Sequence, residues 1–339
     1  MRLWTRLAAV AAILVMAVGA SASTAQAQTP LKIRVAWVVP VANWASIIYH
    51  KKDLMRHYGK SYVVEPIHFK GTPPMITALA AGELDIADLA YSSFALAVEN
   101  AGMSDLRIIG DEAQDGAHGY HSGEYYVLKD GPIHTIADLK GKVAADVGAG
   151  SAVDIAIRVM LHKHGLEAPR DYSIIEAGFP NMTSLLAEKK ADLVSNVAPF
   201  IYTPQFEKIA RPLFSAVDAL GGPSQFVIWT AHEEFLKKHR AAMLDFMEDA
   251  IRAVHFLTNP KNHAAAVQIA SQIAKQPPAR LEWIYTKKDL YRDPNMLPNL
   301  PNLQRAVDAQ YQVGYLKHRL DVMKYADLSI VKEAAARIK

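Results

Sequence analysis

Strand-like segments alternate with helix-like segments along this chain in two successive cycles, and this alternation limits the fold more than any other feature. The strand-like segments are residues 31–38, 62–69, 84–87 and 106–109 in the first cycle, and 143–147, 173–176 and 192–195 in the second. Turn residues and helix stops, such as Gly82 and Gly165, separate them. Strands that alternate with helices in this way form mostly parallel sheets with helices on both faces.

The two cycles predict an α/β protein of two lobes, each a mostly parallel sheet flanked by helices. We expect lobe I to comprise residues 28–123 and 229–339, and lobe II residues 124–228. The extended segments Tyr125–Leu128 and Gln225–Trp229 are predicted to cross between the lobes as a two-stranded hinge. The chain is helical from Glu233 onward and is expected to pack back on lobe I.

The first 27 residues have the composition of a secretory signal peptide. Arg2 and Arg6 precede an apolar run from Leu7 to Val18, and small residues lead to Ala27, after which cleavage is expected. The alternative is a membrane anchor, but the run is shorter than the roughly 20 residues of a spanning helix. The sequence therefore predicts a periplasmic protein.

Composition excludes several classes of function. The net charge of +3 is nearly balanced and no basic stripe is present, so no nucleic-acid partner is expected. The chain has no cysteine, which excludes disulfides and a lipid-carrying cysteine. An apolar content of 51% over 339 residues is sufficient for sizeable cores, and we expect a monomer.

The sequence Gly148-Ala149-Gly150-Ser151 follows a strand and opens a helix, as phosphate-binding turns do. It lacks the lysine of the GxxxxGK[ST] pattern and the third glycine of GxGxxG, so it does not predict a nucleotide site. A turn of this kind still leaves the N–H groups of the helix start free to bind an anion.

Arrangements of residues typical of catalysis or metal binding are missing from the sequence. Neither GxSxG nor HExxH occurs. His118 and His121 lie in a glycine-rich loop, and His162 and His164 point away from each other on a helix. We therefore predict no enzyme activity, no cofactor and no metal site.

Ligands in open α/β sheets bind beyond the carboxyl ends of the strands. Helices that start there carry Thr72, Ser92 or Ser151, which either bind a ligand or serve only as N-caps. Aromatic residues near the same ends would supply apolar walls, and few cationic residues accompany them. This favours a compact organic anion with a flat or apolar part. The predicted ligand-binding residues are Trp44, Gly71, Thr72, Tyr91, Ser92, Gly150, Ser151, Ala152, Asn181, Asn196, Phe200 and Trp229.

Three stretches of sequence resemble one known family. FKGTPPMITALAAGELDIADLAYSSFALAVENAG (69–102), IHTIADLKGKVAADVGAGSAVDIAIRVMLHKHGL (133–166) and NMTSLLAEKKADLVSNVAPF (181–200) are similar to patterns of ABC-transporter substrate-binding proteins. The class is that of sulfonate, taurine and nitrate binders, and its wider family includes binders of the thiamine pyrimidine precursor.

The resemblance implies a type II periplasmic binding protein that closes on its ligand and delivers it to a membrane permease with a cytoplasmic ATPase. The family's ligand contacts map onto Trp44, Thr72, Tyr91, Ser92 and Ser151. Tyr91 stands where sulfonate binders carry a smaller, glycine-containing turn, and no arginine suits a small inorganic anion. We therefore expect an aromatic carboxylate, such as a phthalate-like or benzoate-like acid, or a sulfonate.

Two alternatives stay open at the level of the sequence. The chain could bind a thiamine pyrimidine precursor or another heterocycle, or act as the ligand-binding domain of a sensor. A third, a pyrimidine synthase of related fold, would need a cysteine-rich iron-binding segment, which this sequence lacks.

Overall fold

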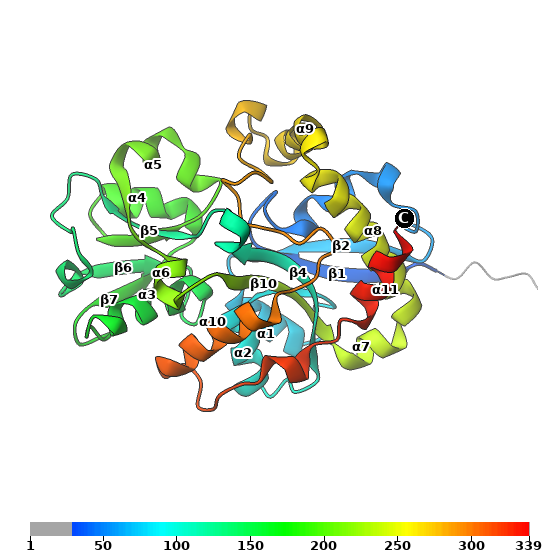
Figure 1. Ribbon diagram of the computed structural model, residues 1–339, viewed down its shortest axis with the longest axis horizontal. Coiled ribbons are helices and arrows are strands. Elements are labelled where there is room, and N and C mark those ends of the chain that lie inside the picture. The colour runs from blue at the N-terminus through cyan, green and yellow to red at the C-terminus, as the bar shows by residue number, and fades with distance from the viewer. Residues whose placement is uncertain (1–28, 339) are drawn as a thin grey trace, which may run out of the picture.

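The computed structural model describes residues 29–338, so the predicted signal peptide at residues 1–27 lies outside the described residues. The strands are β1 (Leu31–Trp37), β2 (Tyr62–His68), β3 (Ala87–Ala90), β4 (Leu106–Asp115), β5 (Glu124–Leu128), β6 (Val143–Asp146), β7 (Ser173–Glu176), β8 (Leu193–Asn196), β9 (Ala210–Ser215) and β10 (Ser224–His232). They form two groups that lie side by side, each flanked by helices (Figure 1).

The group that contains both ends of the described chain is built around β10. Strands pair in the order β3-β10-β4, and a parallel bridge between Val35 and Ile86 brings the parallel pair β1-β2 against β3. The second group is a single sheet in the order β7-β6-β8-β5-β9. β10 and β5 run antiparallel to their neighbours, while β6 pairs parallel with β7 and β8. The architecture is the two-lobed α/β fold, with one reversed strand in each lobe.

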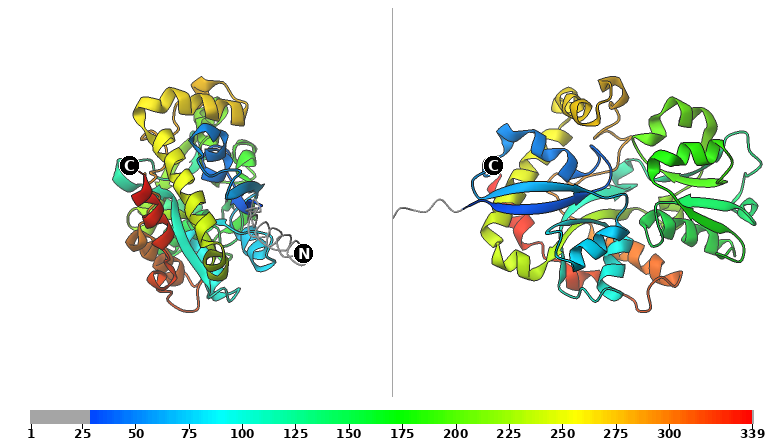
Figure 2. Two further views of the ribbon diagram at one scale, coloured as in Figure 1. Left: turned by 90° about the vertical axis from the view of Figure 1, so that its right-hand side faces the viewer. Right: turned by 180° about the vertical axis from the view of Figure 1, so that it is seen from behind.

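The helices cover both faces of each sheet (Figures 1 and 2). They are α1 (Pro73–Ala80), α2 (Tyr91–Glu99), α3 (Ala152–Lys163), α4 (Met182–Ala187), α5 (Pro204–Ile209), α6 (Ala216–Leu220), α7 (Glu233–Lys238), α8 (Arg240–Thr258), α9 (His263–Ala274), α10 (Leu300–Gln312) and α11 (Ser329–Arg337). α8 and α11 pack together within the first lobe, and α10 packs on β10 and α2 and also touches α3 and α6 of the second lobe. Within residues 29–338, no helix combines the length and apolar character that a membrane span requires.

Consecutive residues of the strands point into different cores, as the period of two requires. Trp229 packs with β1, β2 and α8, whereas Ile228 packs with α1, α2 and α10. In the second lobe, Tyr125 packs on the α3 side and Tyr126 on the α4 side. Each sheet is thus buried on both faces, which fixes the position of its strand ends.

The connections between the lobes differ from those predicted. Tyr125–Leu128 lies inside β5, between β8 and β9, because Tyr125, Tyr126 and Val127 are buried in the cores on both faces of the sheet. The chain passes from the first lobe to the second before β5, at residues 116–123. Asp115 accepts hydrogen bonds there from Ser122 Oγ and the Gly123 N–H. Gln225–Trp229 lies inside β10 for the same reason, so the return crossing is at residues 221–223.

Candidate ligand-binding site between the lobes

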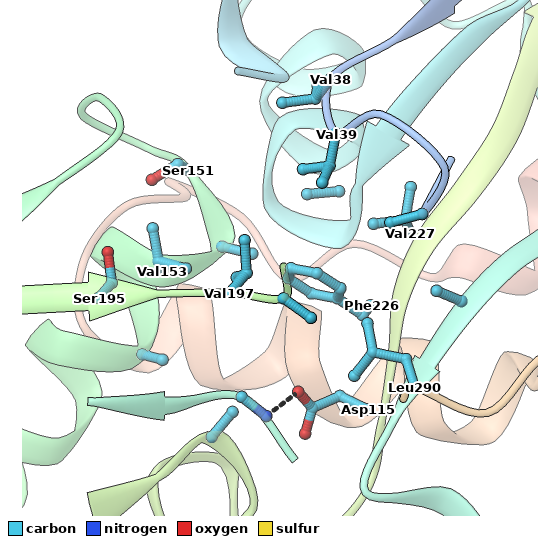
Figure 3. Close-up of a pocket in the computed structure, with 18 of the residues that line it drawn as sticks. Val38, Val39, Asp115, Ser151, Val153, Ser195, Val197, Phe226, Val227 and Leu290 are labelled. Atoms are coloured by element: carbon cyan, nitrogen blue, oxygen red, sulfur yellow. Dashed lines mark hydrogen bonds between the residues drawn. The ribbon is translucent and has the colours of Figure 1, made fainter. Parts of the chain in front are cut away.

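A cavity lies where the strand ends of the two lobes face each other (Figure 3). The first lobe contributes the loop after β1 and the starts of α1 and α2, and the second contributes the start of α3 and the end of β8. Most of the surface of its wall is apolar, and the apolar residues are Val38, Val39, Ala42, Ala90, Ala113, Val147, Ala152, Val153, Ala156, Phe179, Val197, Ala198, Ala216, Leu220, Phe226, Val227 and Leu290. A mainly apolar surface with polar groups set into it is typical of small-molecule sites.

Six of the predicted ligand-binding residues line this cavity. They are Gly71, Thr72, Tyr91, Ser151, Ala152 and Asn196. They come from both lobes, so the fold brings together residues that are far apart in the sequence.

The other six predicted residues lie elsewhere. Trp44 and Trp229 are fully buried in the core of the first lobe that also contains α8. Ser92 is buried in the first turn of α2, and Gly150 packs against Leu96. Asn181 is exposed and Phe200 is half-buried, and neither is part of the cavity lining.

The loop that carries Val38 and Val39 is held by two side chains that the sequence did not single out. Asn43 Oδ1 accepts the N–H groups of Val38 and Val39 at 3.0 and 2.6 Å. Glu112 in turn accepts hydrogen bonds from Asn43 Nδ2 and from the Trp44 N–H. The cavity wall is therefore fixed from behind by a buried carboxyl group.

The start of α3 points into the cavity as a cluster of donors. Ser151 Oγ caps the helix by accepting the Asp154 N–H at 3.2 Å, which leaves the hydroxyl hydrogen available. In the part of the chain that the structure describes, the Ala152 and Val153 N–H groups have no acceptor. Two free N–H groups and the helix dipole attract the negative end of a ligand.

The start of α3 also contains an acid of its own. The Asp154 carboxylate accepts hydrogen bonds from the Gly150 N–H, from Arg158 and from the Tyr315 hydroxyl. Burial and the neighbouring Asp154 raise the pKa of Asp146 to about 7. Because Asp154 already accepts the Gly150 N–H, the N–H groups left for a ligand are those of Ala152 and Val153.

The two lobes touch around the cavity. The Tyr91 hydroxyl of the first lobe donates to the Ala152 carbonyl of the second at 3.2 Å. An added Cβ at Gly71 of the first lobe would meet the Val147 carbonyl oxygen of the second at 3.4 Å. These two contacts join the lobes beside the cavity. Within the first lobe, Thr72 Oγ1 and Ser93 Oγ are 2.7 Å apart and pair with each other.

Carboxyl groups outnumber bases on the cavity wall. The acids are Asp88, Asp115, Glu124 and Asp289, and the bases are His121, Lys288 and Arg292, of which Lys288 is exposed. Arg292 is buried and is paired with Asp289 at 2.9 Å, while it also donates to the Ala42 carbonyl at 2.7 Å. Burial raises the pKa of Asp115 to about 6 and that of Asp88 well above its usual range, and it lowers that of His121. The wall is thus not an electropositive pocket.

One group of possible metal ligands lies outside the cavity. His57, Asp245 and Glu248 have ligand atoms within 4.8 Å of one another. Arg252 donates to Glu248 at 2.6 Å, and Arg337 lies 3.8 Å from Asp245. Because arginines already neutralise these carboxylates, the group is an ion-pair network rather than a cation site.

Comparison with known proteins agrees with this architecture. The chain is similar in structure to the alkanesulfonate-binding protein SsuA from Xanthomonas axonopodis pv. citri bound to MOPS, at a TM-score of 0.68 and 18% identity, over 88% of this chain and 99% of that one. The periplasmic nitrate-binding protein NrtA from Synechocystis PCC 6803 matches with a TM-score of 0.68 at 15% identity, over 91% of this chain and 89% of that one. The desulfurization enzyme DSZB matches with a TM-score of 0.64 at 14% identity, over 91% of this chain and 100% of that one.

At these identities the likeness establishes the fold. No curated protein matches the sequence. The model of the NMT1-like family matches residues 26–271, which is most of the chain. On this match, the chain belongs to the NMT1-like family.

Proposed function

We propose that this protein is the periplasmic solute-binding component of an ABC importer and that it holds a small organic molecule with an anionic group between its lobes. The observation that carries the proposal is the cavity, which is lined from both lobes and meets the donors at the start of α3. Structural relatives named as an alkanesulfonate-binding protein and a periplasmic nitrate-binding protein support the same role.

The aromatic part of the cavity wall limits the class of ligand. Phe179 and Phe226 give the cavity aromatic sides, and Phe226 lies at its centre in Figure 3. A ligand with a flat or apolar body gains from this surface, whereas nitrate has none to bury. We therefore favour an aromatic carboxylate or a sulfonate with an apolar part, bound at its acid end by the Ser151 hydroxyl and the Ala152 and Val153 N–H groups.

The desulfurization enzyme DSZB, a structural relative, favours the alternative of an enzyme. A mutant of DSZB with a cysteine replaced by serine is described in complex with biphenyl-2-sulfinic acid, at a TM-score of 0.61 and 13% identity. This chain contains no cysteine. We propose a binding role, with closure of the lobes around the ligand and release to a permease as its cycle.

A thermal-shift panel tests this function. It should contain aromatic mono- and dicarboxylates, alkyl and aryl sulfonates, nitrate, a thiamine pyrimidine precursor and, as controls, a sugar and a peptide. A ligand present at 100 times its dissociation constant raises the free energy of unfolding by about 2.7 kcal/mol. We expect an organic acid to raise the melting temperature. A response to the sugar or the peptide alone would contradict the proposal.

Ser151→Ala tests the place of binding. Loss of the cap is expected to cost roughly 1 kcal/mol of stability and, in addition, to weaken the binding of the acid. Thr203→Ala is the matched control, because Thr203 caps α5 by accepting the Phe206 N–H and lies outside the cavity lining. Equal affinity in both variants would show that Ser151 is only a cap.

A further inference from the structure

Asp88 is a buried carboxyl group on the cavity wall that has no hydrogen-bond partner. It is 1% exposed, and neither Oδ1 nor Oδ2 is paired with any group in residues 29–338. It lies in β3, where Ala87 and Leu89 point into the apolar core on the other side. An unpaired buried carboxyl group is costly, so its retention needs a reason.

The surrounding residues do not satisfy Asp88. Arg292 lowers its pKa through charge, but the guanidinium donates to Asp289 and to the carbonyls of Leu290 and Ala42. Glu112, the other titratable neighbour, repels a second negative charge. Trp229 lies opposite Asp88 in the β3–β10 ladder, yet its indole N–H has no acceptor within the described chain.

The second lobe presents the opposite chemistry to the same cavity. Asn196 is 2% exposed, its Oδ1 accepts the Val197 N–H, and its Nδ2 is an unpaired donor. The free N–H groups of Ala152 and Val153 lie on this side as well. The unpaired Asp88 oxygens of the first lobe and the unpaired donors of the second therefore belong to residues that line one cavity.

We infer that the ligand is bipolar: its acid end meets Asn196 and the start of α3, and a nitrogen with N–H groups at its other end meets the Asp88 carboxylate. This inference rests on the proposed function and specifies its substrate class as an amino-substituted organic acid. Asp88 then acts as the residue that selects the nitrogen, because a ligand with hydrogen or methyl at that position would leave both carboxylate oxygens unpaired.

The charge balance of the wall agrees with this class. Carboxyl groups outnumber bases on the wall, so a purely anionic compound would meet more acids than cations. Burial disfavours the ionised form of Asp88, whereas an ammonium or amidine group beside it would favour that form and supply the hydrogen bonds that the carboxylate lacks. Charge-assisted hydrogen bonds of this kind are the strongest that a protein makes with a small ligand.

Matched ligand pairs test the inference by titration calorimetry on the mature full-length protein. The pairs are 4-(aminomethyl)benzoate with 4-methylbenzoate, and taurine with ethanesulfonate. We expect the amino compound of a pair to bind at least about tenfold more tightly than its partner. A partner that binds as tightly as the amino compound, or more tightly, would overturn the inference while the proposed function stands. No binding by any member of the pairs or of the acid panel would contradict the proposed function and the inference with it.

Asp88→Asn separates a contact with the ligand from a structural role. We expect this variant to lose the preference for the amino compound and to keep the affinity for its partner, while the ligand-free protein melts at the same or a higher temperature. Asp53→Asn is the control, since Asp53 is an exposed acid that pairs with Lys51. A preference that persists in Asp88→Asn would also overturn the inference.

Discussion

Replacement of Gly150 by alanine disturbs the contact between the lobes without altering the cavity lining. Gly150 has a φ of +77°, and a Cβ placed on it would lie 2.6 Å from Leu96 Cδ1 of the facing lobe. The left-handed backbone costs a non-glycine residue roughly 1–2 kcal/mol. The contact with Leu96 then forces either that side chain off its rotamer, at about 0.5–1.5 kcal/mol, or the lobes apart.

The cost of the contact with Leu96 applies only when the lobes are closed, so it reduces ligand affinity. An energy of about 0.5–1.5 kcal/mol corresponds to roughly 2- to 13-fold weaker binding of the best compound from the acid panel, as measured by titration calorimetry. Gly165→Ala is the control, because Gly165 has a φ of +76° and nothing within 4 Å of an added Cβ. We expect both variants to lose similar stability, with affinity reduced only in Gly150→Ala.

A second substitution checks the cause of this loss. Leu96→Ala removes the atom that the new Cβ would strike, so the double variant should regain affinity relative to Gly150→Ala alone, as a double-mutant cycle would show. If Gly150→Ala binds the ligand as tightly as Gly165→Ala, the lobes do not meet at this contact when the ligand is bound, and the reasoning is refuted.

Three further predictions concern residues around the cavity. Tyr91→Phe removes the hydroxyl that donates to the Ala152 carbonyl. The lost hydrogen bond between the lobes is worth about 0.5–1.5 kcal/mol, which should weaken ligand binding roughly 2- to 13-fold. Tyr311→Phe, a control at an exposed tyrosine, should leave the affinity measured by calorimetry unchanged. Arg292→Met leaves buried Asp289 without its cation and should lower the free energy of unfolding by about 3–5 kcal/mol in denaturant titrations. Arg319→Met, which removes a surface ion pair, should cost at most about 1 kcal/mol. Equal losses in the two variants would contradict this prediction. Burial on folding raises the pKa of Asp115 from 3.8 to about 6, so between these pH values the folded protein binds more protons than the unfolded chain. The free energy of unfolding therefore falls as pH rises from about 4 to 6, by up to about 1.4 kcal/mol per pH unit. Asp115→Asn should flatten this slope in thermal melts at a series of pH values, and an unchanged slope would contradict the prediction.

The alternation of strands and helices was sufficient to predict two α/β lobes, because each βα unit carries its own turns and caps. The sequence did not reveal where the chain crosses between lobes. Tyr125–Leu128 and Gln225–Trp229 have the β-branched and aromatic residues of any buried strand, and only pairing with β8, β9, β3 and β4 places them inside the sheets.

For the site, the cap residues were the better guide and the aromatic residues the poorer one. Thr72 and Ser151 lie on the cavity wall because parallel strand ends converge at one edge of a sheet. Trp44 and Trp229 have the same apolar character as Phe226, but they face the α8 core. Asp88 carried no signal in the sequence, because a lone aspartate in a short strand shows neither its burial nor the partners that it lacks.

Binding of one ligand inside the interlobe cavity is the central claim, and a variant that fills the cavity tests it. Val197 is half-buried on the wall and labelled in Figure 3, and Val197→Trp would fill space that a ligand needs. Val63→Trp is the control, because Val63 is half-buried on β2 and lies outside the cavity lining. Titration calorimetry with the best acid should show one site in the wild type and in Val63→Trp, and none in Val197→Trp. Undiminished binding by a folded Val197→Trp would contradict the account.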